Sequence, residues 1–185
     1  MSMGGFDSLR FKELMLYVSE RMFDDPSFGA VKLNKVLYFS DFIAYSSLGH
    51  PITGATYQKL KNGPAPRQLL PAQRELEEED AAELVESAYF GGYTQKRLIP
   101  QRKADLSSFS AEEISLVDEV IEDLRGRSAS EVSELSHRAV GWQIAEVGED
   151  IPYETALLSD DPLTMEDVER AKELASEHGW LDVQP

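Results

Sequence analysis

The chain has 185 residues, of which 42% are hydrophobic and none is cysteine. These values predict one domain of ordinary size, with or without an appendage, and they exclude disulfides, thiolate metal sites and cysteine nucleophiles. Residues 1–103 contain 13 basic and 13 acidic side chains, so the net charge of −16 comes entirely from residues 104–185. Because an acidic surface repels phosphates, this part predicts a solvated face, or a face for a basic partner, rather than a nucleic acid site.

Three helices are expected in the first half of the chain. Apolar residues at helical spacing predict a helix over residues 8–23 and a second one over residues 30–48, which Gly49 ends. The second helix is apolar around much of its circumference, which places it near the centre of the fold. A third helix is expected over residues 66–79, and Pro71 requires that it begin near this proline or bend there.

The sequence LVESAYFGGYTQKRLIP carries the clearest β signal. Two strand-like runs lie on either side of Gly91 and Gly92, which favour the positive φ angles of a two-residue hairpin turn. We therefore predict one β-hairpin near residues 84–99, packed on helices because an isolated hairpin is only marginally stable. The earlier segment GHPITGATYQ is expected to be a short extended or looped connection.

The remainder of the chain is expected to be helical. Two capping boxes, Ser110 to Glu113 and Ser128 to Glu131, each precede a run with helical apolar spacing. A short helix is expected over residues 142–147 and a last one over residues 164–178. The predicted fold class is mainly α, a compact bundle of about six helices with one inserted β-hairpin.

The sequence lacks the motifs of common enzyme classes. Its histidines, His50, His137 and His178, are far apart and form no zinc-binding pattern. Neither a phosphate-binding loop nor a nucleophile elbow occurs. We therefore predict no catalytic constellation, no metal and no cofactor, while a metal-dependent or acid–base enzyme stays an alternative.

The second helix carries a polar stripe beside its core face. Asn34, Tyr38, Asp41 and Tyr45 are spaced by four, three and four residues, so they share one side of the helix. One interpretation is a buried network in which Asp41 bonds to a tyrosine hydroxyl or to loop amides. The alternative is the polar floor of a cleft for a substrate or small ligand, near Tyr57 and His137.

Several cations in the neutral half could form a basic patch. Lys32 and Lys35 lie on another flank of the second helix, and Lys59 and Lys61 follow soon after it. Scattered, solvated lysines are the alternative. Without adjacent aromatic and basic residues of a nucleic acid module, a patch here indicates a protein partner.

The segment KLKNGPAPRQ joins turn residues to positive charges. Pro64 restricts the backbone of the residue before it, so the segment around Gly63 is expected to be a rigid corner. This corner would present Lys59, Lys61 and Arg67 to a partner.

The segment LSHRAVGW contains two further candidate residues. Trp142 is expected to anchor helix packing, and His137 lies near the end of a short helix, where the dipole favours a cation. Binding of a partner or ligand is the alternative role for this pair.

Three motifs in order carry a resemblance to a known family. The motifs are KLNKVLY, which includes Lys32, Lys35 and Tyr38; GHPITGATYQKLKNGPAP, which includes Tyr57, Gly63 and Pro64; and SHRAVGW, which includes His137 and Trp142. Together they resemble the Panacea domain of the SocA-like antitoxin family, which is also related to phage-associated GepA proteins. Two departures are Ala65-Pro66, where the family often has a branched apolar residue, and Gly141, where it often has proline.

The resemblance implies a mainly helical domain that neutralises a toxin by direct binding. The partner would be a toxin encoded by an adjacent gene, and a protease if the protein acts as a proteolytic adaptor like SocA. The family has no established catalytic residues, so none is implied here. The expected domains are a Panacea-like domain over residues 1–158 and a docked helical extension over residues 159–185. A cytoplasmic location is expected from the lack of cysteine, and no apolar run is long enough to predict a membrane span.

Overall fold

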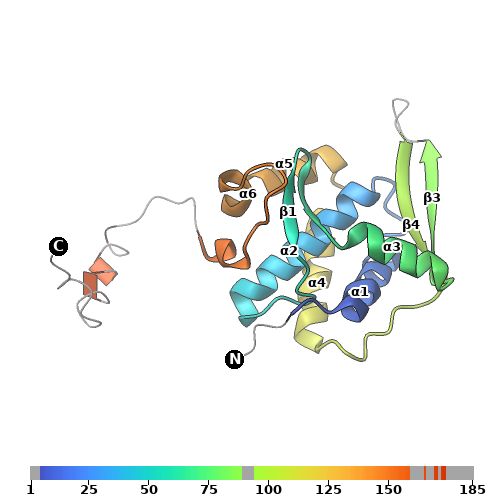
Figure 1. The fold of residues 1–185 in the computed structure, drawn as a ribbon, viewed down its shortest axis with the longest axis horizontal. Helices are drawn as coiled ribbons and strands as arrows, with labels where there is room; N and C mark the ends of the chain where they lie inside the picture. The colour runs from blue at the N-terminus through green and yellow to red at the C-terminus, as the bar shows by residue number, and fades with distance from the viewer. Residues whose placement is uncertain (1–4, 89–93, 159–164, 166–168, 171, 174–185) are drawn as a thin grey trace.

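The computed structural model describes residues 5–88, 94–158, 165, 169–170 and 172–173 (Figure 1). The elements in chain order are α1 (Ser8–Arg21), α2 (Ala30–Leu48), β1 (Tyr57–Leu60), β2 (Gly63–Pro66), α3 (Leu69–Glu78), β3 (Ala82–Ala88), β4 (Thr94–Pro100), α4 (Ala111–Leu124), α5 (Ala129–His137), α6 (Val140–Ile144) and the 3-10 helix η2 (Tyr153–Leu157). The prediction of a mainly α fold with a β-hairpin is confirmed.

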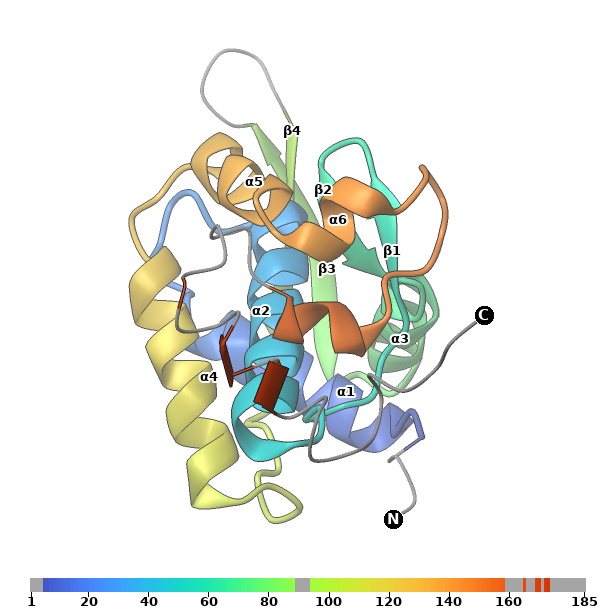
Figure 2. The same cartoon turned by 90° about the vertical axis from the view of Figure 1, so that its left-hand side faces the viewer.

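Helix α2 lies at the centre of the fold. It contacts α1, α4, α5, β2 and η2, and Figure 2 shows α4 and the β1–β2 hairpin on opposite sides of it. Leu33, Val36 and Leu37 are almost completely buried. The helix ends at Gly49, whose φ of 82° lies in the left-handed region that glycine adopts without strain. The predicted position and central place of this helix are confirmed.

The predicted hairpin is formed by β3 and β4. The two strands are antiparallel, with Ala82 opposite Pro100 at one end and Ala88 opposite Thr94 at the other. The hairpin packs on α1 through β4 and on α3 through β3, as Figure 1 shows. The turn predicted at Gly91 and Gly92 lies outside the described residues.

A second hairpin, β1–β2, was not predicted. The segment expected to be a looped connection and a rigid corner pairs antiparallel, with Lys59 opposite Pro64 and Tyr57 opposite Pro66. The amide of Lys59 points instead to the other edge, where it donates to the carbonyl of Glu149. Both prolines therefore occupy positions that need no N–H in the β1–β2 ladder, which is why two prolines are compatible with this strand.

The remaining helices follow the predicted pattern with shifted ends. Helix α3 begins at Leu69, two residues before Pro71, which confirms the predicted start near this proline. Pro71 therefore lies in the first turn, where an amide would have no helical partner. Both capping boxes are present, at Ser110 for α4 and at Ser128 for α5. The short helix expected over residues 142–147 begins and ends earlier, as α6. Most of the predicted extension, residues 159–185, lies outside the described residues, so its docking stays a prediction.

Candidate functional site

The polar stripe of α2 points into the core at Asp41. This carboxylate is completely buried and accepts hydrogen bonds from the Thr53 amide at 2.7 Å, the Thr53 hydroxyl at 2.6 Å and the Tyr57 hydroxyl at 2.7 Å. Burial raises the pKa of Asp41 even though these hydrogen bonds act in the opposite direction. Asp41 thus joins α2 to Thr53 and to the first residue of β1. This arrangement agrees with the interpretation of the stripe as a buried network.

The other stripe residues do not form a polar cleft with Asp41. The Tyr38 ring packs edge-on against the Tyr57 ring, and Tyr45 stacks on Tyr153. An apolar groove of about 180 Å³ beside α2 is lined by Tyr38 but not by Asn34, Asp41 or Tyr45. The geometry therefore gives the small-ligand alternative no support at this stripe.

Lys35 and the β1–β2 hairpin meet at a close contact. The Lys35 ammonium donates to the carbonyl of Pro64 at 3.0 Å. A Cβ atom at Gly63 would lie only 2.6 Å from Lys35 Cε and would also overlap the Ser136 hydroxyl. Gly63, with a φ of 100°, thus leaves the space that Lys35 and Ser136 occupy.

Helices α5 and α6 close over the same hairpin through Trp142. The His137 ring stacks on the Trp142 ring at 4.0 Å with an interplanar angle of 15°. The Lys59 ammonium lies 4.3 Å from the centre of the Trp142 ring and donates to the carbonyl of Ala145 at 3.0 Å. The Trp142 indole N–H donates to the carbonyl of Leu60 at 3.2 Å.

These contacts bring together residues that are far apart in the sequence. We call this group the signature cluster and define it by its members: Lys35, Lys59, Gly63, Pro64, Ser136, His137 and Trp142. The cluster joins α2, the β1–β2 hairpin, α5 and α6, which lie next to one another in Figure 2. It contains residues from all three sequence motifs, which makes it the candidate functional site.

The signature cluster holds positive charge without a carboxylate. In the described part of the chain, no ion pair joins Lys35 or Lys59 to an acidic side chain. Burial lowers the pKa of Lys35 to about 8. Burial, and then the charges of Lys35 and Lys59, lower the pKa of His137, whose buried Nε2 has no hydrogen-bond partner among the described residues. The negative charge of Glu134 acts on the pKa of His137 in the opposite direction. The site therefore contains two lysines without an ion pair beside a histidine whose Nε2 is unbonded among the described residues.

The prediction of an exposed basic patch is wrong for two of its lysines. Lys32 is buried in an ion pair with Asp25, and Lys35 is buried against Pro64. The reason is that α5 and the segment before α2 cover this flank of the helix. Lys59, Lys61 and Arg67 do lie at the hairpin, and Arg67 pairs with Asp150 at 2.6 Å.

Replacing Lys35 with methionine should raise the free energy of unfolding by about 2 kcal/mol at pH 7. The lowered pKa of Lys35 means that its buried charge costs the wild-type protein about 3 kcal/mol of stability, which methionine would recover. Loss of the hydrogen bond to Pro64 would cancel about 1 kcal/mol of that gain. Because the unfolded chain binds this proton more tightly, wild-type stability should rise between pH 8 and 10.5. The gain of the variant should therefore shrink at pH 9.5, as measured by chemical denaturation.

The matched control is Lys61→Met, because Lys61 is exposed and makes no ion pair with any described residue. Its stability should stay within about 0.5 kcal/mol of wild type. A Lys35→Met protein less stable than wild type at pH 7 would show that the buried charge is compensated.

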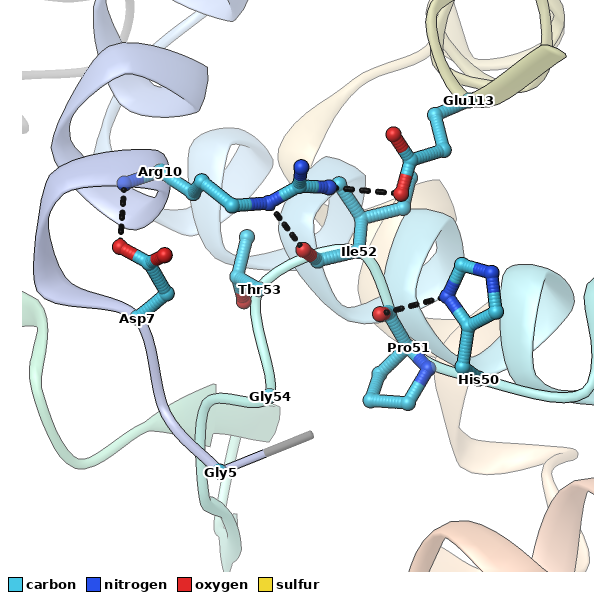
Figure 3. Close-up of a pocket in the computed structure, with 9 residues that line it drawn as sticks. All are labelled: Gly5, Asp7, Arg10, His50, Pro51, Ile52, Thr53, Gly54 and Glu113. Atoms are coloured by element: carbon cyan, nitrogen blue, oxygen red, sulfur yellow. Dashed lines mark hydrogen bonds and ion pairs between the residues drawn. The ribbon is translucent and has the colours of Figure 1, made fainter. Parts of the chain in front are cut away.

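A second pocket lies between the start of α1 and the loop after α2. Figure 3 shows Arg10 at its wall, donating to the carbonyl of Ile52 at 2.9 Å and pairing with Glu113 at 2.6 Å. The same guanidinium also donates to the carbonyl of Ser108. Because the protein itself uses these donors, the pocket wall is an internal brace between α1, α4 and the loop.

Metal-binding clusters and membrane-spanning helices are both absent from the described residues. Among the described residues, no group of three or more histidine, aspartate and glutamate side chains is placed to hold a metal ion. No helix in this part of the chain has both the length and the apolar character needed to cross a bilayer.

A family model matches more than half of the chain. The model described as antitoxin SocA-like, Panacea domain, matches residues 33–143. The chain belongs to this family. The match begins within α2 and ends within α6, and so includes every residue of the signature cluster. Comparisons with curated proteins and with solved structures found no match.

Some residues that matter to these sites were not predicted from the sequence. Asp25 is the partner of Lys32, and Thr53 holds Asp41 with two hydrogen bonds. Tyr153 donates to the carbonyl of Ala55 at 2.6 Å and packs on Phe42. Of these residues, only Tyr153 could have been recognised in the sequence as a candidate core residue, because it is an aromatic residue in the segment after α6.

Proposed function

We propose that this protein is an antitoxin that neutralises a cognate toxin by direct protein–protein binding. The observation that carries the proposal is family membership over a range that contains the whole signature cluster. The toxin would be encoded by an adjacent gene, and binding would occur in the cytoplasm.

The architecture supports a binding role because the hairpin is held from several sides. Lys35 holds Pro64 from α2, Trp142 holds Leu60 from α6, and the amide of Ile151 donates to the carbonyl of Tyr57. A rigid surface loses less conformational entropy when a partner binds. The hairpin is thus a pre-organised element on which partner contacts can be placed.

A catalytic role has no comparable support. Asp41, the acidic member of the polar stripe, is completely buried and bonded to Thr53 and Tyr57. A general acid or base must reach its substrate within hydrogen-bond distance. We therefore infer that the polar stripe stabilises the fold, and that function lies in binding.

Expression of the product of the adjacent gene should stop growth, and co-expression of this protein should restore it. The two proteins should also co-purify at a fixed ratio, because direct binding is the proposed mode of neutralisation. If the neighbouring product is harmless alone, or stays toxic in the presence of this protein, the antitoxin proposal fails.

Measuring toxin abundance distinguishes direct inhibition from a role as a proteolytic adaptor. Direct inhibition predicts that toxin levels stay constant while growth recovers. A proteolytic adaptor predicts that toxin levels fall, and that rescue is lost in cells whose ATP-dependent proteases are inactive.

A further inference from the structure

The last residue of α5, His137, covers the ring of Trp142 in α6. The two ring centres are 4.0 Å apart, and the ring planes differ by 15°. Trp142 in turn donates its indole N–H to the carbonyl of Leu60 in β1. The stack therefore links the His137 ring to the contact that holds α6 on the β1–β2 hairpin.

The buried nitrogen of this imidazole has no acceptor for a proton. The Nε2 atom of His137 is buried and has no hydrogen-bond partner among the described residues. A neutral imidazole can leave Nε2 without a proton, whereas an imidazolium carries a proton on both ring nitrogens. A buried donor of a charged group that lacks an acceptor is more costly than a neutral acceptor in the same place. The surroundings of Nε2 therefore favour the neutral ring.

The charges around the ring favour the same neutral form. Burial has the largest effect on the pKa of His137 and lowers it, and the charge of Lys35 in α2 lowers it further. Glu134 in α5 raises this pKa, and Lys59 in β1 lowers it. Helix α5 also contacts β2 and α6, but neither contains an ionisable side chain. Arg138, the next residue along the chain, is exposed.

Attraction between an imidazolium and the indole acts against this preference. A cation over the face of a tryptophan ring is stabilised by the electrons of the ring. The Lys59 ammonium, however, already lies 4.3 Å from the centre of the Trp142 ring. A charged His137 would share this ring with Lys59 and be repelled by it. We therefore expect burial and repulsion to outweigh the attraction.

We propose that His137 is a pH-sensitive switch in which the neutral imidazole holds α6 on the β1–β2 hairpin and the imidazolium releases it. The protonated ring moves toward solvent, away from Lys35 and Lys59. Trp142 then loses its stacking partner and is held less firmly at Leu60. Because the unfolded chain takes up this proton more readily, the protein should lose stability as the pH falls below about 6.5. This inference concerns the free protein, so it does not depend on the proposed partner.

The test follows the exposure of Trp142 from about pH 8 to about pH 5, a range that includes the ordinary pKa of histidine. All proteins carry Trp180→Phe, which leaves Trp142 as the one tryptophan. Acrylamide quenching of its fluorescence should increase about twofold or more on acidification, with a midpoint below about pH 6.5. His137→Phe keeps an aromatic ring beside Trp142 but binds no proton, so quenching should not change with pH. The matched control His50→Phe, which replaces an exposed histidine, should behave as wild type.

Variants of two charged neighbours test the switch without altering the ring. Lys35→Met removes a charge that lowers the pKa of His137, so the midpoint should move to higher pH. Glu134→Gln removes a charge that raises this pKa, so the midpoint should move to lower pH. NMR titration of the His137 ring protons measures the midpoint independently of the fluorescence.

Three results would overturn the switch. The first is an increase in quenching that persists in His137→Phe. The second is quenching that stays constant while the ring protons of His137 titrate, because the imidazolium would then remain stacked on Trp142. The third is a midpoint at or above about pH 6.5, because the fold would then not favour the neutral ring.

Discussion

Replacing Lys32 with methionine should lower the free energy of unfolding by about 3–5 kcal/mol at neutral pH. Lys32 is buried and pairs with Asp25, which also accepts hydrogen bonds from the hydroxyl of Ser27 at 2.6 Å and from the Gly126 amide at 3.1 Å. Without Lys32, a buried carboxylate stays in the core with no countercharge. Denaturant unfolding at pH 7 measures the loss.

The pH dependence of stability checks the same contact. Burial acts to raise the pKa of Asp25, but Lys32 and the hydrogen bonds from Ser27 and Gly126 outweigh it and lower the pKa to about 2. Because this pKa is below its ordinary value, Asp25 contributes stability above about pH 4 that is lost as the pH falls through about 2. This acid-dependent loss should become smaller in Lys32→Met.

A double variant separates charge from packing. Asp25→Asn combined with Lys32→Met removes both charges, so it should be more stable than Lys32→Met alone. A loss below about 1 kcal/mol for Lys32→Met, or a double variant no better than the single one, would show that the ion pair does not stabilise the core.

Lys32 and Lys35 also show what the sequence could not predict. They are three residues apart on one helix, and helical spacing predicted their shared flank correctly. Nothing in the local sequence shows that Asp25 meets Lys32, while the carbonyl of Pro64 meets Lys35. Burial of a lysine depends on the elements that cover it, so two similar residues are expected to change stability in opposite directions when each is replaced by methionine.

The helices were predictable because their signals are local. The capping box at Ser110 and the glycine at position 49 act within a few residues of each helix end, and both are observed. The β1–β2 hairpin was missed because prolines are rare in paired strands, and Pro64 is tolerated only through the register with Lys59. The two-residue turn between Leu60 and Gly63 sets that register, while residues 148–151, which are distant in sequence, bond to the other edge of β1.

The candidate site was predictable only in part. The motifs contained the residues of the signature cluster, and the resemblance indicated the family that the match over residues 33–143 shows. The stacking of His137 on Trp142 and the place of Lys59 over the same ring required the fold. These contacts join α5, α6 and β1, and no spacing rule within one element predicts them.

Replacing Gly63 with valine should lower the free energy of unfolding by about 3–5 kcal/mol. Valine is strained at a φ of 100°, and its Cβ would overlap Ser136 and lie 2.6 Å from Lys35 Cε. The measurement is denaturant unfolding at pH 7. Gly49→Val is the matched control, because Gly49 also has a positive φ, of 82°, but nothing lies within 4 Å of its added Cβ.

The control should lose only about 1–2 kcal/mol, from backbone strain alone. The difference between the two glycines then measures how closely Lys35 and Ser136 pack against the hairpin. Gly63→Val should also weaken the rise in stability between pH 8 and 10.5, because a displaced Lys35 ammonium becomes solvated and its pKa returns toward the ordinary value. Equal losses at both glycines, with the rise in stability unchanged, would mean that Gly63 serves the turn and not the signature cluster.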